Sequence, residues 1–208
     1  RAGWFNTEIF SEKLGLEKKL LNITELRFDN CWEGYSENKK IFSSQNLILA
    51  TGANLELLPD QLEIKKIRGQ AIAVDTRDLK SILNGVVTIF PTVNGESVVS
   101  GTYQDSSILQ ISPADTNLLL EQAERLLGKS LRIRREWVGL RASARDRTPI
   151  VGQAPKWADL TKTQRVRDVK LFEPGLHYCL AFGSRGATHA RLYSEQLVSK
   201  ILGEPCAL

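Results

Sequence analysis

The residues with the clearest chemical potential lie near the end of the chain, in a glycine-rich turn between a buried strand and a helix. The apolar run 176–182 leads through this turn into a helix that starts with small residues. Such a turn exposes free backbone N–H groups at the positive end of the helix dipole and lets a ligand approach closely. The sequence therefore predicts an electron-rich ligand here, with an ordinary tight turn as the alternative. The predicted ligand site comprises Gly183, Ser184, Arg185, Gly186, Ala187 and Thr188.

Two other segments carry residues suited to the same ligand or to its reaction partner. The apolar strand 46–50 ends at Thr51-Gly52, and ligands of open α/β sheets lie at the carboxyl ends of strands. Gly52 is therefore a candidate ligand contact, although many buried strands simply end on glycine. Arg141 lies near the end of a predicted strand, where its planar guanidinium could bind a carboxylate through two hydrogen bonds. An exposed arginine without a ligand is the alternative for Arg141.

Catalysis by protein side chains or metal ions is not indicated. Ser184 lies outside a Gly-x-Ser-x-Gly motif and has no acid-base partner nearby in the sequence. The two histidines, His177 and His189, are expected to be structural. The cysteines are widely spaced and form no Cys-x-x-Cys pair, so the sequence specifies neither a disulfide framework nor a metal site. We predict no catalytic side chain and no metal.

The first sixty residues are expected to form strands, of which one belongs to a central sheet. Thr7 can cap a short helix that runs through about Leu14. Segments 23–28 and 31–35 alternate loosely like strands, with a polar turn at Glu37-Asn38, and the nearly all-apolar run 46–50 predicts a strand buried on both faces.

The middle of the chain predicts an antiparallel sheet and one helix. Runs 86–91 and 97–103 flank Asn94-Gly95, a pair that favours a tight hairpin turn. Ser112 and Pro113 open a helix that Gly128 ends, and 132–142 is strand-like. The predicted buried face of the helix consists of Leu118, Leu119, Ala123, Leu126 and Leu127.

The last third predicts a return to the central sheet. A segment bounded by proline and glycine covers 148–155, a polar surface loop covers 156–175, and the final helix ends near Gly203. The fold class is therefore mixed α/β, with 1–60 and 146–208 in one layered unit and 61–145 in an antiparallel one.

Charge gives a weaker indication of the partner. The chain has 28 Lys and Arg against 24 Asp and Glu, a net charge of +4 that favours a polyanion without requiring one. The basic residues lie in clusters that fit either solvated surface or nucleic-acid contact. No apolar run is long enough to span a membrane, and residues 1–10 do not resemble a secretory signal, so a cytoplasmic protein is expected. The clusters are Lys65, Lys66 and Arg68; Arg132, Arg134 and Arg135; Arg141, Arg145 and Arg147; and Lys162, Arg165 and Arg167.

Taken in order, these segments resemble the landmarks of the D-amino-acid-oxidase family of FAD-dependent oxidoreductases. Within the family, the run Arg-Asp-Arg-Thr-Pro-Ile-Val-Gly at 145–152 and Phe-Gly-Ser-Arg-Gly at 182–186 most resemble the oxidase domain of bifunctional enzymes that modify the wobble uridine of tRNA. Ala2-Gly3-Trp4-Phe5 is similar to an early segment of that domain. The resemblance rests on 46–53, 67–70, 90–91 with 99–102, 139–152 and 181–186.

The resemblance implies part of an FAD-binding Rossmann-like domain (1–60 and 146–208) and an antiparallel substrate domain (61–145). FAD would contact Gly52 and 183–188, and Arg141 would bind the substrate carboxylate. No Gly-x-Gly-x-x-Gly turn occurs in the chain, so it is not expected to hold FAD tightly by itself. Thr88 stands where glycine-oxidase-like relatives often carry a tyrosine.

The implied reaction is oxidation of the C–N bond of an N-substituted glycine unit. The first hypothesis is removal of the carboxymethyl group from a modified wobble uridine, with tRNA as partner and a methyltransferase domain fused or paired. The second is oxidation of free glycine or D-amino acids. The third is a fragment that keeps the fold without the cofactor.

Overall fold

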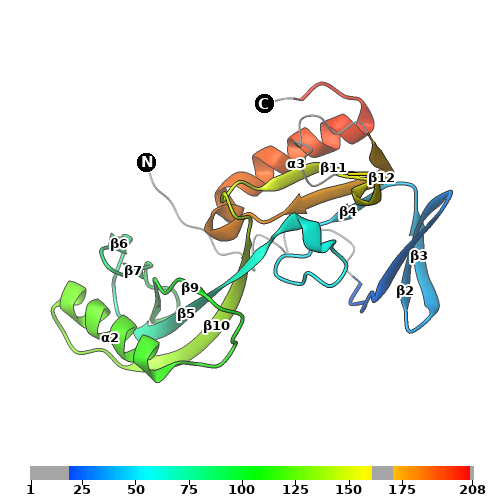
Figure 1. The fold of residues 1–208 in the computed structure, drawn as a ribbon. Coiled ribbons are helices and arrows are strands. Elements are labelled where there is room, and N and C mark those ends of the chain that lie inside the picture. Colours follow the sequence, from blue (N-terminus) through cyan, green and yellow to red (C-terminus); the bar gives the residue numbers. More distant parts are fainter. Residues whose placement is uncertain (1–18, 161–170, 207–208) are drawn as a thin grey trace. The chain divides into compact units, whose positions relative to one another are not determined.

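The structure is a computed structural model that describes residues 19–160 and 171–206, and it has the mixed α/β fold predicted from the sequence (Figure 1). The chain divides into two units. Unit 1 includes Gln70–Thr102 and Ile111–Trp137, and unit 2 consists of Ile23–Gly69, Tyr103–Gln110 and Val138–Leu208. The predicted helix 7–14, the segment Ala2-Gly3-Trp4-Phe5 and the cluster Lys162, Arg165 and Arg167 lie outside the described residues.

A three-stranded mixed sheet forms the centre of unit 2. Its order is β11 (Ile150–Pro155), β12 (Phe172–Leu180) and β4 (Leu47–Leu49), with β12 antiparallel to β11 and parallel to β4. The parallel pairing confirms that segment 46–50 belongs to a mixed sheet. Its predicted burial on both faces is wrong, because side chains alternate between faces and Ile48 is 41% exposed between its covered neighbours.

A second, antiparallel sheet in unit 2 consists of β1 (Glu25–Asp29), β2 (Cys31–Ser36) and β3 (Lys39–Ser44). The predicted polar turn between β2 and β3 has both residues at positive φ, Glu37 at 48° and Asn38 at 66°. Trp32 on β2 donates a hydrogen bond from Nε1 to the carbonyl of Pro174 on β12, at 2.7 Å. The buried core of unit 2 comprises Trp32, Leu49, Ala154, Leu176, Tyr178, Leu180 and Ala181.

The predicted surface loop 156–175 is too long at both ends. Residues 172–175 belong to β12. Trp157, in the short 3-10 helix η2 (Trp157–Asp159), packs against the core of unit 2 and places Nε1 3.3 Å from the hydroxyl of Tyr178. The polar composition of this stretch did not indicate that Trp157 packs against the core or that residues 172–175 begin a strand.

The antiparallel sheet follows the order β10 (Ile133–Ser143), β5 (Lys65–Asp75), β8 (Glu96–Ser100), β7 (Thr88–Ile89) and β6 (Leu83–Asn84). The short strand β9 (Gln104–Asp105) also pairs with β5. The hairpin predicted at Asn94-Gly95 is confirmed, with φ of 52° and 81° at its two residues. The paired strands are shorter than the apolar runs 86–91 and 97–103.

Helix α2 (Pro113–Leu127) confirms the predicted boundaries. The hydroxyl of Ser112 accepts a hydrogen bond from the backbone N–H of Asp115, and Gly128 ends the helix at φ 64°. The predicted buried face is only partly correct, since Leu119 and Ala123 are fully buried but Leu118 and Leu126 are 45% and 40% exposed. In the buried core of unit 1, residues of α2 pack against residues of the antiparallel sheet. This core comprises Ile72, Val74, Val87, Ile89, Val99, Leu119 and Ala123.

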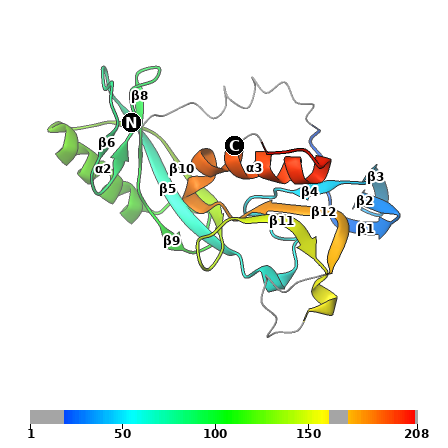
Figure 2. The same ribbon diagram turned by 90° about the horizontal axis from the view of Figure 1, so that it is seen from above.

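Helix α3 (Gly186–Leu202) follows β12 and ends at Gly203, as predicted. It lies along one face of the mixed sheet in both views (Figure 1, Figure 2). Among residues 19–160 and 171–206, no helix has the length and apolar character needed to cross a membrane. Two short 3-10 helices, η1 (Asp60–Leu62) and η4 (Gly183–Arg185), complete the described elements.

Candidate active site

The junction between β12 and α3 lines a cavity, as its sequence suggested. Ala181 and Gly183 both have left-handed backbone angles, φ 60° and 58°, which turn the chain sharply out of the sheet. The 3-10 turn η4 then leads directly into α3. Glycine suits position 183 because residues with a Cβ rarely adopt this backbone angle. The turn is therefore open to a ligand on the cavity side.

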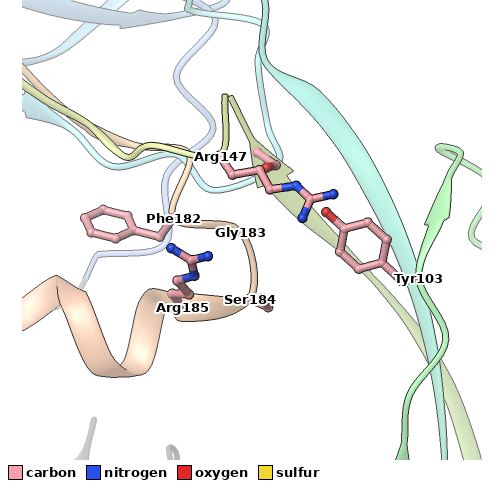
Figure 3. A pocket seen from close by; sticks show the side chains of 7 residues that line it. Tyr103, Arg147, Phe182, Gly183, Ser184 and Arg185 are labelled. Carbon is pink, nitrogen blue, oxygen red and sulfur yellow. The ribbon is translucent and has the colours of Figure 1, made fainter. Parts of the chain in front are cut away.

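The cavity belongs entirely to unit 2 and has a volume of about 220 Å³. Three of the predicted ligand residues line it, namely Gly183, Ser184 and Arg185. The Arg147 side chain extends toward the Tyr103 ring, while the Arg185 side chain lies beside the turn (Figure 3). The complete lining is Tyr103, Ser143, Arg147, Phe182, Gly183, Ser184 and Arg185.

Strand β10 and the turn after it deliver two of these residues. Ser143 is the last residue of β10 and forms an isolated β-bridge with Phe182, which holds the glycine turn against this strand end. Arg147 follows in the turn to β11, where its backbone N–H donates to the carbonyl of Ala144 at 3.0 Å. The backbone of Arg147 is left-handed, at φ 62°. Arg147 thus carries a long basic side chain in a backbone conformation that glycine adopts more readily.

Tyr103 is positioned by a buried arginine on the neighbouring strand β5. Arg68 is only 3% exposed, and it donates to the side chain of Gln104 at 3.0 Å and to the carbonyls of Ile108 and Gln110 at 3.1 and 2.8 Å. These bonds fix the segment that follows Tyr103. The assignment of Arg68 to a solvated or nucleic-acid-binding cluster is therefore wrong, because its guanidinium holds the protein's own backbone.

The cavity is electropositive. Its lining contains two guanidinium groups and three hydroxyl side chains, and it contains no carboxylate. The first N–H groups of α3 receive no side-chain cap, because Arg185 occupies the N-cap position without making such a bond. Uncapped N–H groups at a helix start attract negative charge. The arrangement suits a negatively charged or electron-rich ligand.

The remaining predicted ligand residues do not line the cavity. Gly186 starts α3, and Ala187 and Thr188 are exposed on its first turn. The hydroxyl of Thr188 donates to the carbonyl of Arg185 at 3.0 Å. Gly52, at φ 58° and exposed, follows β4. Because β4 and β12 are parallel, Gly52 and the glycine turn follow strand ends on the same edge of the mixed sheet.

Arg141 lies on β10 against the backbone of β5. A Cβ built on Gly69 would stand 2.1 Å from Nη1 of Arg141, so the absence of a side chain at Gly69 makes room for the guanidinium. Nη1 is buried, and no described residue accepts a hydrogen bond from it. Such a donor normally has a partner. Arg141 thus has an unused donor available for a ligand, although it does not line the cavity at the glycine turn.

The sequence did not single out four cavity residues, Tyr103, Ser143, Arg147 and Phe182. Arg147 was grouped in a basic cluster that fits solvated surface or nucleic-acid contact, and the only other local signal was its place in a polar turn after Asp146, whose Oδ1 accepts from the N–H of Thr148 at 2.9 Å. His177, by contrast, is buried on β12, and burial lowers the pKa of its imidazole. No cluster of three potential metal ligands occurs within 19–160 and 171–206.

Comparison with known proteins identifies the family of this chain and solved structures with a similar fold. The family described as FAD dependent oxidoreductase (DAO) matches residues 17–199. A tRNA 5-methylaminomethyl-2-thiouridine biosynthesis bifunctional protein MnmC from Cupriavidus necator is 28% identical over 207 residues, which cover 88% of this chain and 32% of that protein. The chain thus spans about a third of the length of the curated relatives it matches.

Two solved structures have a similar fold. Glycine oxidase from Geobacillus kaustophilus matches with a TM-score of 0.68 and 16% identity, over 90% of this chain and 49% of that one. Iminodiacetate oxidase from Chelativorans sp. BNC1 matches with a TM-score of 0.65 and 19% identity, over 88% of this chain and 49% of that one. At sequence identities of 16% and 19%, the similarity to these two structures shows a shared fold.

Proposed function

The chain belongs to the FAD dependent oxidoreductase (DAO) family, and from that premise we propose that it forms the flavin- and substrate-facing part of an enzyme that oxidises the C–N bond of an N-substituted glycine unit. The observation that carries this proposal is the electropositive cavity at the glycine turn between β12 and α3. The strand, the left-handed glycine and the uncapped helix start together provide an open backbone surface.

These residues fit a flavin. Gly183 leaves the turn open, and the uncapped N–H groups of α3 suit the negative charge of a reduced ring. Bound FAD supplies the hydride acceptor for the oxidation. The backbone of residues 183–188 would hold the ring, and Gly52 would lie beside the cofactor from the same sheet edge.

Arg141 would orient the substrate. Its buried, unpartnered Nη1 supports a role in binding the substrate carboxylate. A guanidinium can bind both carboxylate oxygens at once, which aligns the substrate and excludes other orientations. The amine-bearing carbon would then face the cofactor.

The proposed substrate is the carboxymethylaminomethyl group on the wobble uridine of tRNA, in the cytoplasm, with a methyltransferase domain in the complete protein. The curated relatives support this choice, since their name describes bifunctional proteins of tRNA 5-methylaminomethyl-2-thiouridine biosynthesis. The net charge of +4 is compatible with an RNA partner.

The second candidate is an oxidase of free glycine or D-amino acids. One observation favours it, because several residues of the predicted RNA-binding clusters are engaged with carboxylates of this chain. Lys65 contacts Asp105 at 2.7 Å and Arg135 contacts Glu96 at 2.7 Å. Arg134 also pairs with Asp75. Such pairs reduce the charge that is free to meet phosphates.

Anaerobic reduction of the flavin distinguishes the candidates. The complete protein with bound FAD is mixed with carboxymethylaminomethyl-modified tRNA or with glycine, and flavin absorbance is followed. We expect bleaching by the modified tRNA and not by glycine. Bleaching by glycine alone would support the second candidate, and failure of the complete protein to bind FAD would overturn both in favour of a protein that keeps the fold without the cofactor.

Variants test the role of Arg141. Arg141→Ala is expected to slow flavin reduction by roughly 30-fold or more at limiting substrate while leaving FAD bound, because a charge-assisted pair contributes about 2 kcal/mol or more. Arg125→Ala is the matched control, since Arg125 is 71% exposed on α2 and pairs only weakly with Glu121 at 3.5 Å. Equal reduction rates in the two variants would show that Arg141 does not bind the substrate.

A further inference from the structure

The cavity at the glycine turn contains a basic residue that the sequence placed in a solvated or nucleic-acid-binding cluster and to which the proposed function assigns no role. Arg147 extends into this cavity from the turn between β10 and β11, toward Tyr103 (Figure 3). Its partner across the lining is Arg185, whose proposed role concerns the backbone of the turn. The two guanidinium groups therefore share a cavity without a carboxylate in its lining.

Several other arginines of the described chain provide a contrast. Arg27, Arg125, Arg134, Arg135 and Arg191 each form an ion pair with a glutamate or aspartate at no more than 3.5 Å. Arg147 and Arg185 form no ion pair or side-chain hydrogen bond with any residue that the structure describes. Two like charges facing one cavity repel each other, and an anion between them removes the repulsion.

The backbone of Arg147 adds an independent argument. At φ 62° it occupies the left-handed region, where glycine is favoured over any residue with a long side chain. A glycine here would make the same turn more easily. Arg147 thus places a guanidinium beside the cavity from a position where the backbone favours glycine.

We propose that Arg147, together with Arg185, binds an oxyanion of the substrate in this cavity, and this assignment rests on the proposed function. The fork of a guanidinium matches a carboxylate and a phosphate equally well. The hydroxyls of Tyr103 and Ser143, which line the same cavity, can donate to the same anion. Arg147 is a binding residue in this assignment, additional to Arg141.

Chemical protection tests the anion site without any turnover. The complete protein with FAD is labelled with phenylglyoxal, which modifies arginine, and labelled peptides are quantified by mass spectrometry. Inorganic phosphate and acetate are the two probes. We expect one or both to slow labelling of Arg147 and Arg185 several-fold while Arg125, exposed and distant in sequence, is labelled at the same rate. Equal labelling of Arg147 with and without both anions would overturn the proposal.

Kinetics with Arg147→Gly identify the source of the oxyanion. We expect KM to rise about tenfold or more with kcat less affected, and Arg147→Lys to retain part of the affinity. A rise for both modified tRNA and a free N-substituted glycine, such as iminodiacetate, indicates a carboxylate. A rise for tRNA alone indicates a phosphate. An unchanged KM for both substrates, in a variant as stable as the parent, overturns the proposal.

The two proposals fail in different ways. If the parent protein oxidises neither substrate, the proposed function is wrong, while protection of Arg147 by phosphate or acetate still decides whether the anion site exists. If oxidation proceeds and Arg147 is neither protected nor needed for low KM, only the anion site is wrong. Thermal unfolding of Arg147→Gly provides the folding control, and we expect a midpoint no lower than that of the parent.

Discussion

At the scale of single residues, Gly69 decides where Arg141 can lie. The ideal Cβ position at Gly69 is 2.1 Å from Nη1 of Arg141, closer than any real contact. The atom that must move is the far end of a flexible side chain and not backbone. A methyl group at position 69 would therefore leave the strands in place and displace the guanidinium from its buried position.

This leads to a first prediction, for Gly69→Ala. We expect a change in unfolding free energy of less than about 1 kcal/mol, together with a rise in KM of about tenfold in the complete enzyme. The double variant with Arg141→Ala should be no worse than Arg141→Ala alone, because both changes remove the same contact. Additive losses in steady-state kinetics would show that Gly69 acts through some other residue.

A second prediction concerns the pH dependence of stability. His177 is 9% exposed, its Nδ1 has no partner among the described residues, and burial lowers its pKa below the ordinary 6.5. Well above pH 6.5 the imidazole is neutral in both folded and unfolded chains, so it has no effect on the pH dependence there. As pH falls below 6.5, the unfolded chain binds the proton first, and stability is lost until the lower folded pKa is reached.

Denaturant unfolding of the full chain across this pH range checks the second prediction. The free energy of unfolding should fall less steeply with acid in His177→Gln than in the parent. His189→Gln is the matched control, because His189 lies on α3 and is less buried than His177. Parallel curves for the parent and His177→Gln would show that His177 is not the group that titrates.

At the scale of elements, local sequence signals identified the turns and caps well and the sheet faces less well. Asn94-Gly95 and the caps at Ser112 and Gly128 are short-range features, so the residues alone specify them. Strand β3 was missed because its sequence, Lys-Lys-Ile-Phe-Ser-Ser, has little apolar periodicity, and it forms through pairing with β2. Exposure of Ile48 likewise depends on which elements cover β4.

The candidate site shows the same division. The glycine turn and its helix were predictable from 176–188 because their chemistry is local. Tyr103 and Arg147 were not, because one is placed by the buried guanidinium of Arg68 and the other by a left-handed backbone at a residue other than glycine. The flavin and carboxylate roles assigned to Gly52, Arg141 and 183–188 remain predictions.

A third prediction isolates the hairpin between β7 and β8. Gly95 has φ 81° and no atom within 4 Å of an ideal Cβ, so Gly95→Ala meets open space and only the backbone angle is unfavourable. We expect a loss of about 1 kcal/mol in unfolding free energy. Gly139→Ala also meets open space, and it lies in β10 without a positive φ. Equal stability of both variants would contradict the conformational explanation.

At the scale of the whole molecule, the net charge of +4 is the balance of many charges that pair within the chain. Ion pairs engage Lys65, Arg134 and Arg135, whereas the cavity arginines Arg147 and Arg185 have no described partner. The division of function among 1–60, 61–145 and 146–208 remains a prediction. Unit 2 gathers residues from three separate stretches of the sequence, among them every residue that lines the cavity at the glycine turn.

A fourth prediction follows from this charge distribution. If tRNA is the substrate, its dissociation constant for the complete protein should rise steeply with salt, because phosphates release counterions on binding. In a plot of the logarithm of the binding constant against the logarithm of the salt concentration, Arg147→Gly should reduce the steepness of the slope by about one if its oxyanion is a phosphate. Arg125→Ala should leave the slope unchanged. A slope near zero in filter-binding or fluorescence titrations would argue against an RNA substrate altogether.

The pairing of β4 with β12 has a consequence for the order of events during synthesis. Leu47 on β4 pairs directly with Leu176 on β12, although more than half of the sequence lies between the two residues. A ribosome must therefore extend the nascent polypeptide well past this second strand before the sheet edge closes. Any ligand of the glycine turn therefore binds late, after the other sheets have had time to assemble.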